Sequence, residues 1–232
     1  MVAITVSREY GSDGTNIAHR VAERLNARYL DREVIEMAFQ LAGLSAPAAQ
    51  PALAQRPPIQ EKEVPGLTRR IVEAVTGPIV SGLQPWPRAV PRQPGPVGED
   101  DSLLRQALPN DEAYVSVLTA VFNRLLEDNR DLVIIGRGGQ CILAGRPNVL
   151  HVHITAPLAY RIQQVIQRED LGADAAANLV RRKDEERARY IRRYHEADWL
   201  QPSLYHLIIN LAWFTPEQAI ELILRAAEMK RA

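Results

Sequence analysis

Hydrophobic residues in this chain form short uninterrupted runs that alternate with longer segments of helical periodicity. The runs lie at positions 2 to 6, 27 to 30, 132 to 135, 149 to 154 and 206 to 210. Short apolar runs that are rich in β-branched residues and bounded by turn residues are typical of strands buried on both faces of a parallel sheet. The pattern therefore predicts five strands.

The segments between these runs carry apolar residues three and four positions apart, which is the spacing of an amphipathic helix. The sequence between Thr215 and Gln218 combines a capping box with proline at the first helical position, which marks a helix start. Another helix is expected to begin after Thr155, with Pro157 in its first turn. The predicted helices span 14 to 27, 32 to 43, 111 to 129, 173 to 195 and 215 to 229, together with the one after Thr155.

Strands that alternate with helices indicate an α/β fold of three layers, in which a five-stranded parallel sheet has helices on both faces and right-handed crossovers. Ligands of such folds bind at the carboxyl ends of the strands. We therefore look for a site in the loops that follow Val6, Leu30 and Ile135.

The composition changes between positions 45 and 98, where 11 of the 16 prolines lie. Because proline interrupts helix interiors and central strands, this segment is predicted to be an insertion or mobile arm. We expect one domain over residues 1 to 232, with the proline-rich arm at 45 to 100 and a lid-like helical segment at 173 to 198.

Composition and charge exclude several classes of protein. Hydrophobic residues make up 46% of the chain, and the 28 basic residues balance the 28 acidic ones, so no overall field favours nucleic acid or a membrane as a partner. Cys141 is the only cysteine, which excludes an intramolecular disulfide and a cysteine-based zinc site. Without a signal peptide or an apolar run long enough to span a bilayer, we expect a cytoplasmic protein.

The first candidate site is the glycine-bearing loop SREYGSDGTNIA at 7 to 18, between the first strand and the first helix. Backbone N–H groups at such a turn, together with the helix dipole, can hold phosphate. The GxxxxGK[ST] signature is absent, so a tight turn that needs glycine only for its geometry is an equal alternative. The candidate phosphate-binding residues are Arg8, Gly11, Ser12, Asp13, Gly14, Thr15 and Asn16.

Two further candidates follow buried strands. Asp31 could bind Mg²⁺ through water or accept a hydrogen bond from a substrate, or it could simply cap the following helix. Arg137 lies between glycines in VIIGRGG, which suits a bidentate phosphate clamp, although it could also pair with a surface carboxylate.

The segment RRKDEERARYIRR at 181 to 193 supplies a third group of candidates. Arg182, Arg189 and Arg193 are separated by seven and four positions, so they share one helix face and could close over a polyphosphate. The alternative is a solvated helix held by pairs such as Arg182 with Glu186. The five histidines show no metal-ligand spacing, and no metal site is predicted.

Taken together, ITVSREYGSDGTNIA, the YLDRE turn, VIIGRGG, HVHITAPLAYRI and DEERARYIRRYHEADWLQPSLYHLIIN resemble the cytidylate kinase-like family of P-loop kinases. The resemblance covers residues 1 to 44 and about 110 to 228. It implies a P-loop kinase fold and transfer of a phosphoryl group from ATP, with Mg²⁺, to a nucleoside monophosphate such as CMP.

The resemblance also implies roles for the candidate residues. The loop at 8 to 16 would hold the donor phosphates, Arg137 would hold the acceptor phosphate, and the arginines of 181 to 193 would form the lid. The chain departs from cytidylate kinases at Gly14, where they have the loop lysine, and at Gly138, where they have an acidic residue. Related lysine-free loops resemble SREYGSGG, and Asp13 adds an anion to that pattern.

Three functions stay open from the sequence. The chain could be a nucleotide kinase, a nucleotide-binding regulatory module that no longer catalyses transfer, or a kinase of another small molecule whose pocket the arm helps to build. A small-molecule nucleotide is the expected partner, with neither nucleic acid nor membrane, and a homodimer is left open.

Overall fold

The computed structural model describes residues 1–31, 33–42, 104–105, 108 and 110–231. The chain forms two compact units, which are described separately below. One comprises residues 1–29 and 129–232, and the other comprises residues 30–128. The predicted proline-rich arm at 45 to 100 lies outside the described residues, so the structure does not test it.

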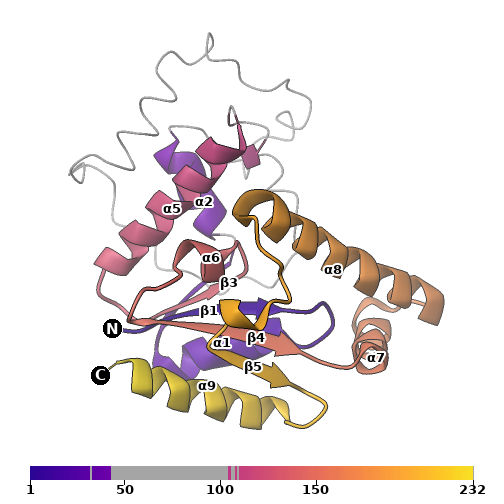
Figure 1. Cartoon of the computed structure of the whole chain (residues 1–232). Coiled ribbons are helices and arrows are strands. Elements are labelled where there is room, and N and C mark those ends of the chain that lie inside the picture. Colours follow the sequence, from indigo (N-terminus) through magenta and orange to yellow (C-terminus); the bar gives the residue numbers. More distant parts are fainter. Residues whose placement is uncertain (32, 43–103, 106–107, 109, 232) are drawn as a thin grey trace. The chain divides into compact units, whose positions relative to one another are not determined.

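A five-stranded parallel sheet organises the larger unit (Figure 1). Its strands, in spatial order, are β2 (Arg28–Leu30), β3 (Leu132–Ile135), β1 (Ala3–Arg8), β4 (Val149–Thr155) and β5 (Leu207–Asn210). β1 lies between β3 and β4, so β2 and β3 lie on one side of it and β4 and β5 on the other. The loops after β1 and β3 therefore meet at the switch point where such sheets bind ligands.

The helices of this unit follow the predicted order. They are α1 (Gly14–Leu25), α6 (Gly139–Ile142), α7 (Leu158–Glu169), α8 (Ala173–His195) and α9 (Pro216–Lys230), with a short 3-10 turn, η3, at Pro202–Leu204. The capping box of Thr215 and Gln218 is confirmed, with Pro216 at the first turn of α9. The predicted bounds of α8 are confirmed as well, and it is a single helix.

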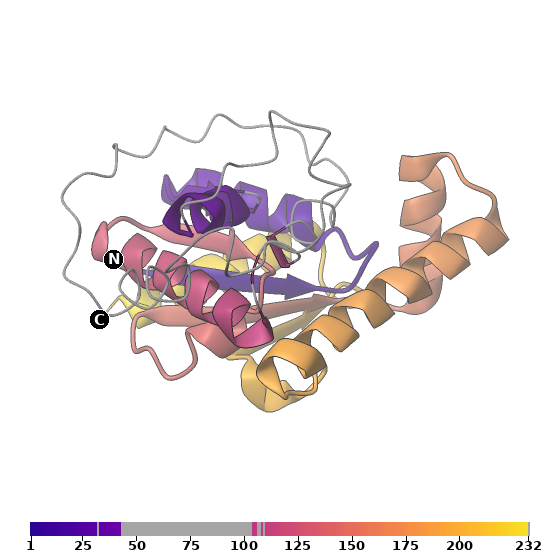
Figure 2. The same ribbon diagram turned by 90° about the horizontal axis from the view of Figure 1, so that it is seen from above.

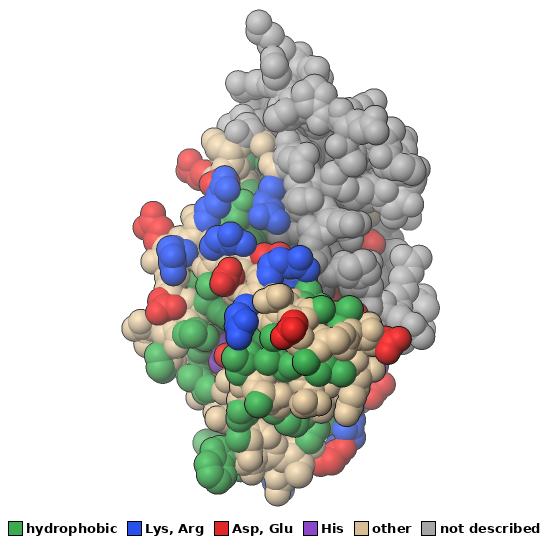
Figure 3. Space-filling model, turned by 90° about the vertical axis from the view of Figure 1, so that its right-hand side faces the viewer, with side chains coloured by type: hydrophobic (Ala, Val, Ile, Leu, Met, Phe, Trp, Pro, Cys, Tyr) green, Lys and Arg blue, Asp and Glu red, His purple; other side chains and the backbone are tan. Residues whose placement is uncertain are grey.

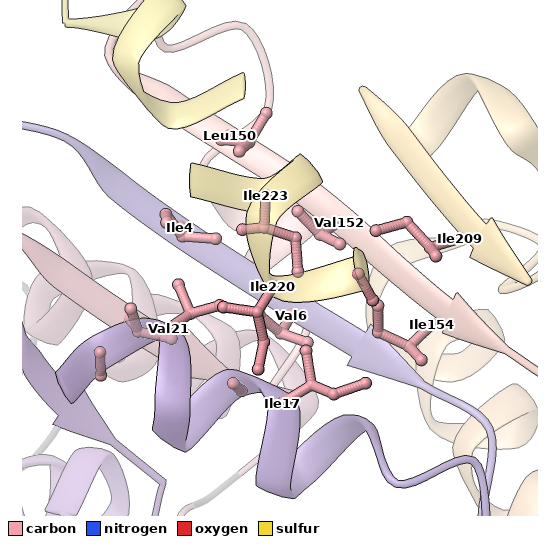
Figure 4. Packing of buried hydrophobic residues seen from close by; sticks show 14 of the residues in the cluster. Ile4, Val6, Ile17, Val21, Leu150, Val152, Ile154, Ile209, Ile220 and Ile223 are labelled. Carbon is pink, nitrogen blue, oxygen red and sulfur yellow. The ribbon is translucent and has the colours of Figure 1, made fainter. Parts of the chain in front are cut away.

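One face of the sheet is apolar and is covered by α1 and α9 (Figure 4). Val6 on β1 and Val152 on β4 are labelled there beside Ile17 of α1 and Ile220 of α9, and all four are at most 1% exposed. Burial of a side chain of this size contributes about 1.5 to 3 kcal/mol. This core fixes the carboxyl end of β1 against the start of α1.

The opposite face of the same two strands is polar and yet buried. Thr5 and Ser7 of β1 alternate with the apolar residues, and so do His151 and His153 of β4. Thr5 Oγ1 lies 2.7 Å from His151 Nδ1. The prediction that these strands are buried on both faces is therefore confirmed, and side-chain hydrogen bonds and aromatic contacts compensate in part for burying the polar groups.

Aromatic residues close this polar face. Trp199 Nε1 donates to Ser7 Oγ at 2.8 Å, and the hydroxyl of Tyr205 donates to the Trp199 carbonyl at 2.7 Å. The rings of both aromatic residues lie against His153, at centroid distances of 5.6 and 4.8 Å. The segment after α8 is thereby attached to β1 and β4.

A second, smaller core joins α7 to α8, which lie side by side in two views (Figures 1 and 2). Its buried residues are Val165, Ala176 and Val180, and Tyr10 from the loop after β1 packs on them. This core brings the helices that precede β5 into contact with the first loop.

The other unit contains α2 (Glu33–Leu41) and α5 (Asp111–Glu127), which pack on each other. Asn110 caps α5 by accepting the Ala113 amide at 2.8 Å. Within the part of the chain that the structure describes, no helix is both long and apolar enough to cross a bilayer.

The buried histidines make the fold sensitive to acid. Burial lowers the pKa of both His151 and His153 to about 4. Between this value and the unfolded value near 6.5, the unfolded chain binds more protons, so stability falls as the pH decreases from about 6.5 toward 4. We expect each histidine to lower the free energy of unfolding at pH 5 by about 1 to 2 kcal/mol relative to pH 7. Urea unfolding at the two pH values measures this change.

A pair of variants isolates this effect. His153→Phe keeps a ring between Trp199 and Tyr205 but cannot titrate, so the loss of stability between pH 7 and pH 5 should become smaller. Trp213→Phe, which changes an aromatic ring at an exposed site without a titratable group, should leave the pH dependence unchanged. Equal pH dependence in the wild type and His153→Phe would contradict the assignment.

Candidate functional site

The loop from Glu9 to Asp13 joins β1 to α1 at the carboxyl edge of the sheet. Gly11 has φ +81°, and a Cβ there would lie 2.6 Å from the carbonyl oxygen of Arg161. Asp13, at the N-cap of α1, has φ 61° and makes no side-chain capping bond. The loop therefore needs glycine at 11 and holds a left-handed residue at 13, which strains its backbone.

The N-terminus of α1 can bind an anion. The Ile17 amide donates to the Asp13 carbonyl at 3.1 Å, which is the first bond of the helix. The amides of Gly14, Thr15 and Asn16 come before it and have no acceptor within the helix. Three predicted residues thus present backbone donors at the positive end of a helix dipole, as a phosphate site requires.

Ser12 has a different place from its neighbours. Its side chain is fully buried, and its hydroxyl donates to the Glu9 carbonyl at 2.8 Å. The Ser12 amide donates to the same carbonyl at 3.3 Å. These bonds close the turn, so Ser12 holds the loop in shape and does not face a ligand.

Arg8 fills the space of a side chain that Gly14 lacks. A Cβ on Gly14 would lie 2.6 Å from Arg8 Cβ and 3.1 Å from Arg8 Cγ. Arg8 is only 7% exposed, and its Nε lies 3.4 Å from Thr15 Oγ1. Its Nη1 is 2.8 Å from where a Cβ on Gly136 would be. The guanidinium therefore extends from the start of α1 to the end of β3.

The loop after β3 has an unusual backbone. Gly136, Arg137 and Gly138 have φ angles of 70°, 56° and 68°, so three consecutive residues are left-handed. A non-glycine residue rarely adopts this conformation, and strain of this kind is concentrated at functional sites. The structure thus places Arg137 on a strained loop beside the Arg8 guanidinium.

His195, at the end of α8, occupies the side-chain space of Gly138. A Cβ on Gly138 would lie 2.1 Å from His195 Nε2. Burial lowers the pKa of His195 to about 4, so the ring is neutral at pH 7. Among the described residues Nε2 has no hydrogen-bond partner. His195 was not predicted as a site residue, because nothing in the sequence around it indicates that its ring lies beside Gly138.

The predicted lid arginines lie on the outer face of α8. Arg182, Arg189 and Arg193 are exposed, and Arg182 is 3.9 Å from Glu186, as the solvated-helix alternative expects. Figure 3 shows basic side chains gathered beside acidic ones on the face that carries α7 and α8. Two of them contact α8 itself, Arg182 at Glu186 and Arg193 at the ring of Tyr194.

Different charged residues of α7 and α8 reach the loop. Arg161, Asp184 and Arg187 are all at least four-fifths buried at their side chains and contact the backbone of residues 8 to 10. Burial, and then the nearby Arg8, lower the pKa of Arg187 to about 9, which leaves it charged at pH 7. A signal existed in the sequence: Val180, Ile191 and Tyr194 form the buried stripe of α8, and positions 184 and 187 continue its spacing.

A depression of about 270 Å³ lies beside the loop. Its walls are formed by Gly11 and Asp13 from the loop and by Gln164, Gln167 and Arg168 from α7. These are polar groups with both donors and acceptors, next to the amides that could bind phosphate. The depression therefore offers both hydrogen-bond donors and acceptors beside the loop.

Asp31 lies in the other unit, which comprises residues 30–128. Its backbone amide donates to Glu33 Oε2 at 3.0 Å, just before α2 begins. In the described part of the chain, no group of three or more His, Cys, Asp or Glu side chains could hold a metal ion.

Comparison with known proteins decides the family. Residues 3–212 match the cytidylate kinase-like family. The chain belongs to this family. Because this match spans nearly the whole chain and the sheet has five parallel strands as predicted, the fold is that of a P-loop kinase.

Individual relatives are more distant. Cytidylate kinase from Sulfolobus acidocaldarius is 29% identical over 82 residues, which are 35% of this chain and 44% of that protein. Uronate isomerase from Corynebacterium glutamicum is 27% identical over 128 residues, which are 52% of this chain and 25% of that protein. The chain thus aligns with less than half the length of either curated relative.

One solved structure resembles the whole chain. It is the crystal structure of an uncharacterized protein from Eubacterium ventriosum, with a TM-score of 0.62, 16% sequence identity, and coverage of 98% of this chain and 99% of that one. At this level of identity the likeness supports the fold alone. The substrate has to be argued from the site.

The contact between Gly138 and His195 makes a prediction about stability. Gly138→Ala should destabilise the protein by about 2 to 4 kcal/mol, because a methyl group collides with the ring and φ is left-handed. In a His195→Ala background the same change should cost only about 1 kcal/mol. Urea unfolding of the four proteins measures the coupling.

Gly145 provides a matched control. It also has a left-handed φ, +74°, but a Cβ there would meet nothing within 4 Å. Gly145→Ala therefore measures the conformational cost alone. If Gly138→Ala costs no more than Gly145→Ala, the ring of His195 does not fill the space beside Gly138.

Proposed function

We propose that this protein transfers the γ-phosphoryl group of Mg-ATP to a nucleoside monophosphate such as CMP. Membership of the kinase family supports a phosphotransferase, and the amides at the start of α1 support binding of the donor phosphates. Phosphoryl transfer depends on positioning and charge rather than on a covalent group of the protein, so these features are consistent with such a reaction.

The place of Arg8 is the observation that carries the proposal. The loop lacks a lysine at Gly14, but the Arg8 side chain lies against Gly14 and points its guanidinium past Thr15 toward Gly136. A positive charge is thereby held at the start of α1 by a different residue. The loop can keep its charge although the lysine is absent.

The remaining groups complete the proposed reaction. Arg137 would hold the acceptor phosphate from the loop after β3, and the exposed Arg182, Arg189 and Arg193 would close over the phosphates. Asp13, at the start of α1, would meet Mg²⁺ through water, and bound Mg²⁺ would neutralise charge on the transferred group. Asp31 is a proposed contact of the substrate.

Variants of Arg8 test the donor site. We expect Arg8→Met, which keeps the packing against Gly14, to weaken binding of Mg-ATP by about tenfold to a hundredfold through the loss of a charge-assisted contact. Arg8→Lys should retain more affinity than Arg8→Met. Calorimetric titration of Mg-ATP measures both, and normal binding by Arg8→Met would remove the donor site from this loop.

Relocation of the charge provides a sharper control. Gly14→Lys alone should disturb the loop because its Cβ collides with Arg8 Cβ. In the double variant Arg8→Gly with Gly14→Lys this collision is absent, so the lysine should restore part of the Mg-ATP affinity that Arg8→Gly loses. No recovery in a folded double variant would count against equivalence of the two charges.

Arg137 tests the acceptor site. Arg137→Gly accommodates the left-handed φ of 56° and removes only the side chain. We expect it to weaken the acceptor by about tenfold to a hundredfold and to leave Mg-ATP affinity nearly unchanged. Equal loss for both ligands, or for neither, would remove Arg137 from this role.

Two alternatives remain, and each has an observation in its favour. The glycine at position 14 favours a regulatory module that binds a nucleotide without catalysis. The neutral ring of His195 beside Gly138 favours an acceptor other than CMP, or a different small molecule. ADP release measured with ATP, Mg²⁺ and each common nucleoside monophosphate separates them. Release with CMP supports the proposal, and release only with another monophosphate supports a different acceptor. Release with none supports the regulatory module or a kinase of a different small molecule.

A further inference from the structure

The backbone of the loop after β1 is held by charged side chains of α7 and α8. The Tyr10 amide donates to Asp184 Oδ1 at 2.8 Å. The other oxygen of Asp184 accepts a bond from Arg161 Nη1. The same nitrogen donates to the Tyr10 carbonyl at 3.3 Å. The backbone amide and carbonyl of Tyr10 are therefore both bound by one buried ion pair.

The two residues before Tyr10 in the chain, Arg8 and Glu9, are also held by polar contacts. Arg187 Nη1 donates to the Arg8 carbonyl at 3.0 Å and lies 3.5 Å from Asp184 Oδ1. Glu9 Oε2 accepts bonds from Thr155 Oγ1 at 2.5 Å and from the Ala156 amide at 3.1 Å. Residues 8, 9 and 10 are consecutive, so the segment that sets the direction of the loop is fixed at each position.

The clamp, defined as Arg161, Asp184 and Arg187, is largely buried. Their side chains are 8%, 19% and 19% exposed. Arg161 is also oriented by Nε, which donates to the Ala156 carbonyl at 2.9 Å and lies 3.4 Å from Glu9 Oε2. A buried pair of this kind is costly to break, because the remaining charge loses its partner in a region of little solvent.

Tyr10 adds a nonpolar attachment at the same place. Its ring packs on the core of α7 and α8, and the guanidinium groups of Arg168 and Arg187 lie 5.1 and 5.5 Å from the ring centroid. The loop and α8 are therefore joined by polar, ionic and hydrophobic contacts. A change in the orientation of α8 would shift the carbonyl of Arg8.

We propose that Asp184 is a positioning residue that holds the loop after β1 in the conformation that binds donor phosphates, so that the middle of α8 is a fixed part of the donor site. This inference rests on the proposed function for the identity of the donor. Asp184 would act through the Tyr10 amide and Arg161 and would not touch the nucleotide.

The test compares Asp184→Asn and Asp184→Ala with Glu185→Gln in the full chain. Asp184→Asn keeps an acceptor for the Tyr10 amide but removes the charge that pairs with Arg161, and Asp184→Ala removes both. Glu185 is the adjacent carboxylate on the same helix and is exposed, so it is a matched control. Circular dichroism identifies variants that remain folded, and Asp184→Asn is the milder change if Asp184→Ala does not fold.

Two measurements are made on each folded protein, namely hydrogen exchange at the Tyr10 amide and calorimetric titration of Mg-ATP. We expect exchange to become faster in Asp184→Ala, and Mg-ATP affinity to fall about tenfold or more there and by a smaller factor in Asp184→Asn. Glu185→Gln should match the wild type in both.

The outcomes separate this inference from the proposed function. Unchanged exchange in the Asp184 variants, or faster exchange with unchanged Mg-ATP affinity, would overturn the positioning role. A wild type that binds Mg-ATP but releases no ADP with any monophosphate would count against the proposed reaction while the comparison of affinities still tests Asp184. A wild type that binds no Mg-ATP, with the Tyr10 amide protected, would overturn both the donor assignment and the positioning role.

Discussion

The buried ion pair of Arg161 and Asp184 is the interaction on which the arrangement of the site depends. It binds both backbone groups of Tyr10 and joins α7 and α8 to the turn between β1 and α1. The apolar core under β1 fixes where the strand ends, but it does not determine how the chain then turns. The charged residues provide that information, and they do so from segments more than 140 positions away in the sequence.

Two glycines show how the site differs from that of a lysine-bearing kinase. Gly14 and Gly138 each lack a side chain, and in both cases a residue from another element fills the space, Arg8 in one and His195 in the other. The first replacement keeps a positive charge near the start of α1. The second puts an uncharged ring beside Arg137. In the proposed reaction the donor side would thus keep a positive charge, whereas the acceptor side would differ from that of a lysine-bearing kinase.

The fold could be predicted from the sequence to a large extent. Apolar runs predicted the five strands and helical periodicity predicted the bounds of α8. The start of α9 was correct because a capping box marks it locally. Burial of β1 and β4 on both faces is confirmed, but the apolar pattern did not show how polar residues such as Ser7 and His153 find partners there. Those partners are Trp199 and Tyr205, which come from the segment after α8 and meet the strands only in the folded chain.

The site was harder to predict. The loop and Arg137 follow from the position of their strands, and the structure places both at the switch point of the sheet. Helical spacing selected the exposed arginines of α8, because arginine was expected to face a ligand. The residues that reach the loop are Asp184 and Arg187, which continue a buried stripe. Spacing alone cannot tell which face of a helix meets a loop distant in sequence.

The contact between Gly14 and Arg8 also has an evolutionary consequence. Because a Cβ at position 14 would lie 2.6 Å from Arg8 Cβ, a lysine cannot be regained there by one substitution without disturbing the loop. The two positions are therefore coupled, and a side chain at position 14 requires a change at position 8 or a shift of its backbone. Within the family the residues at these two positions should covary, with a small residue at one wherever the other is large.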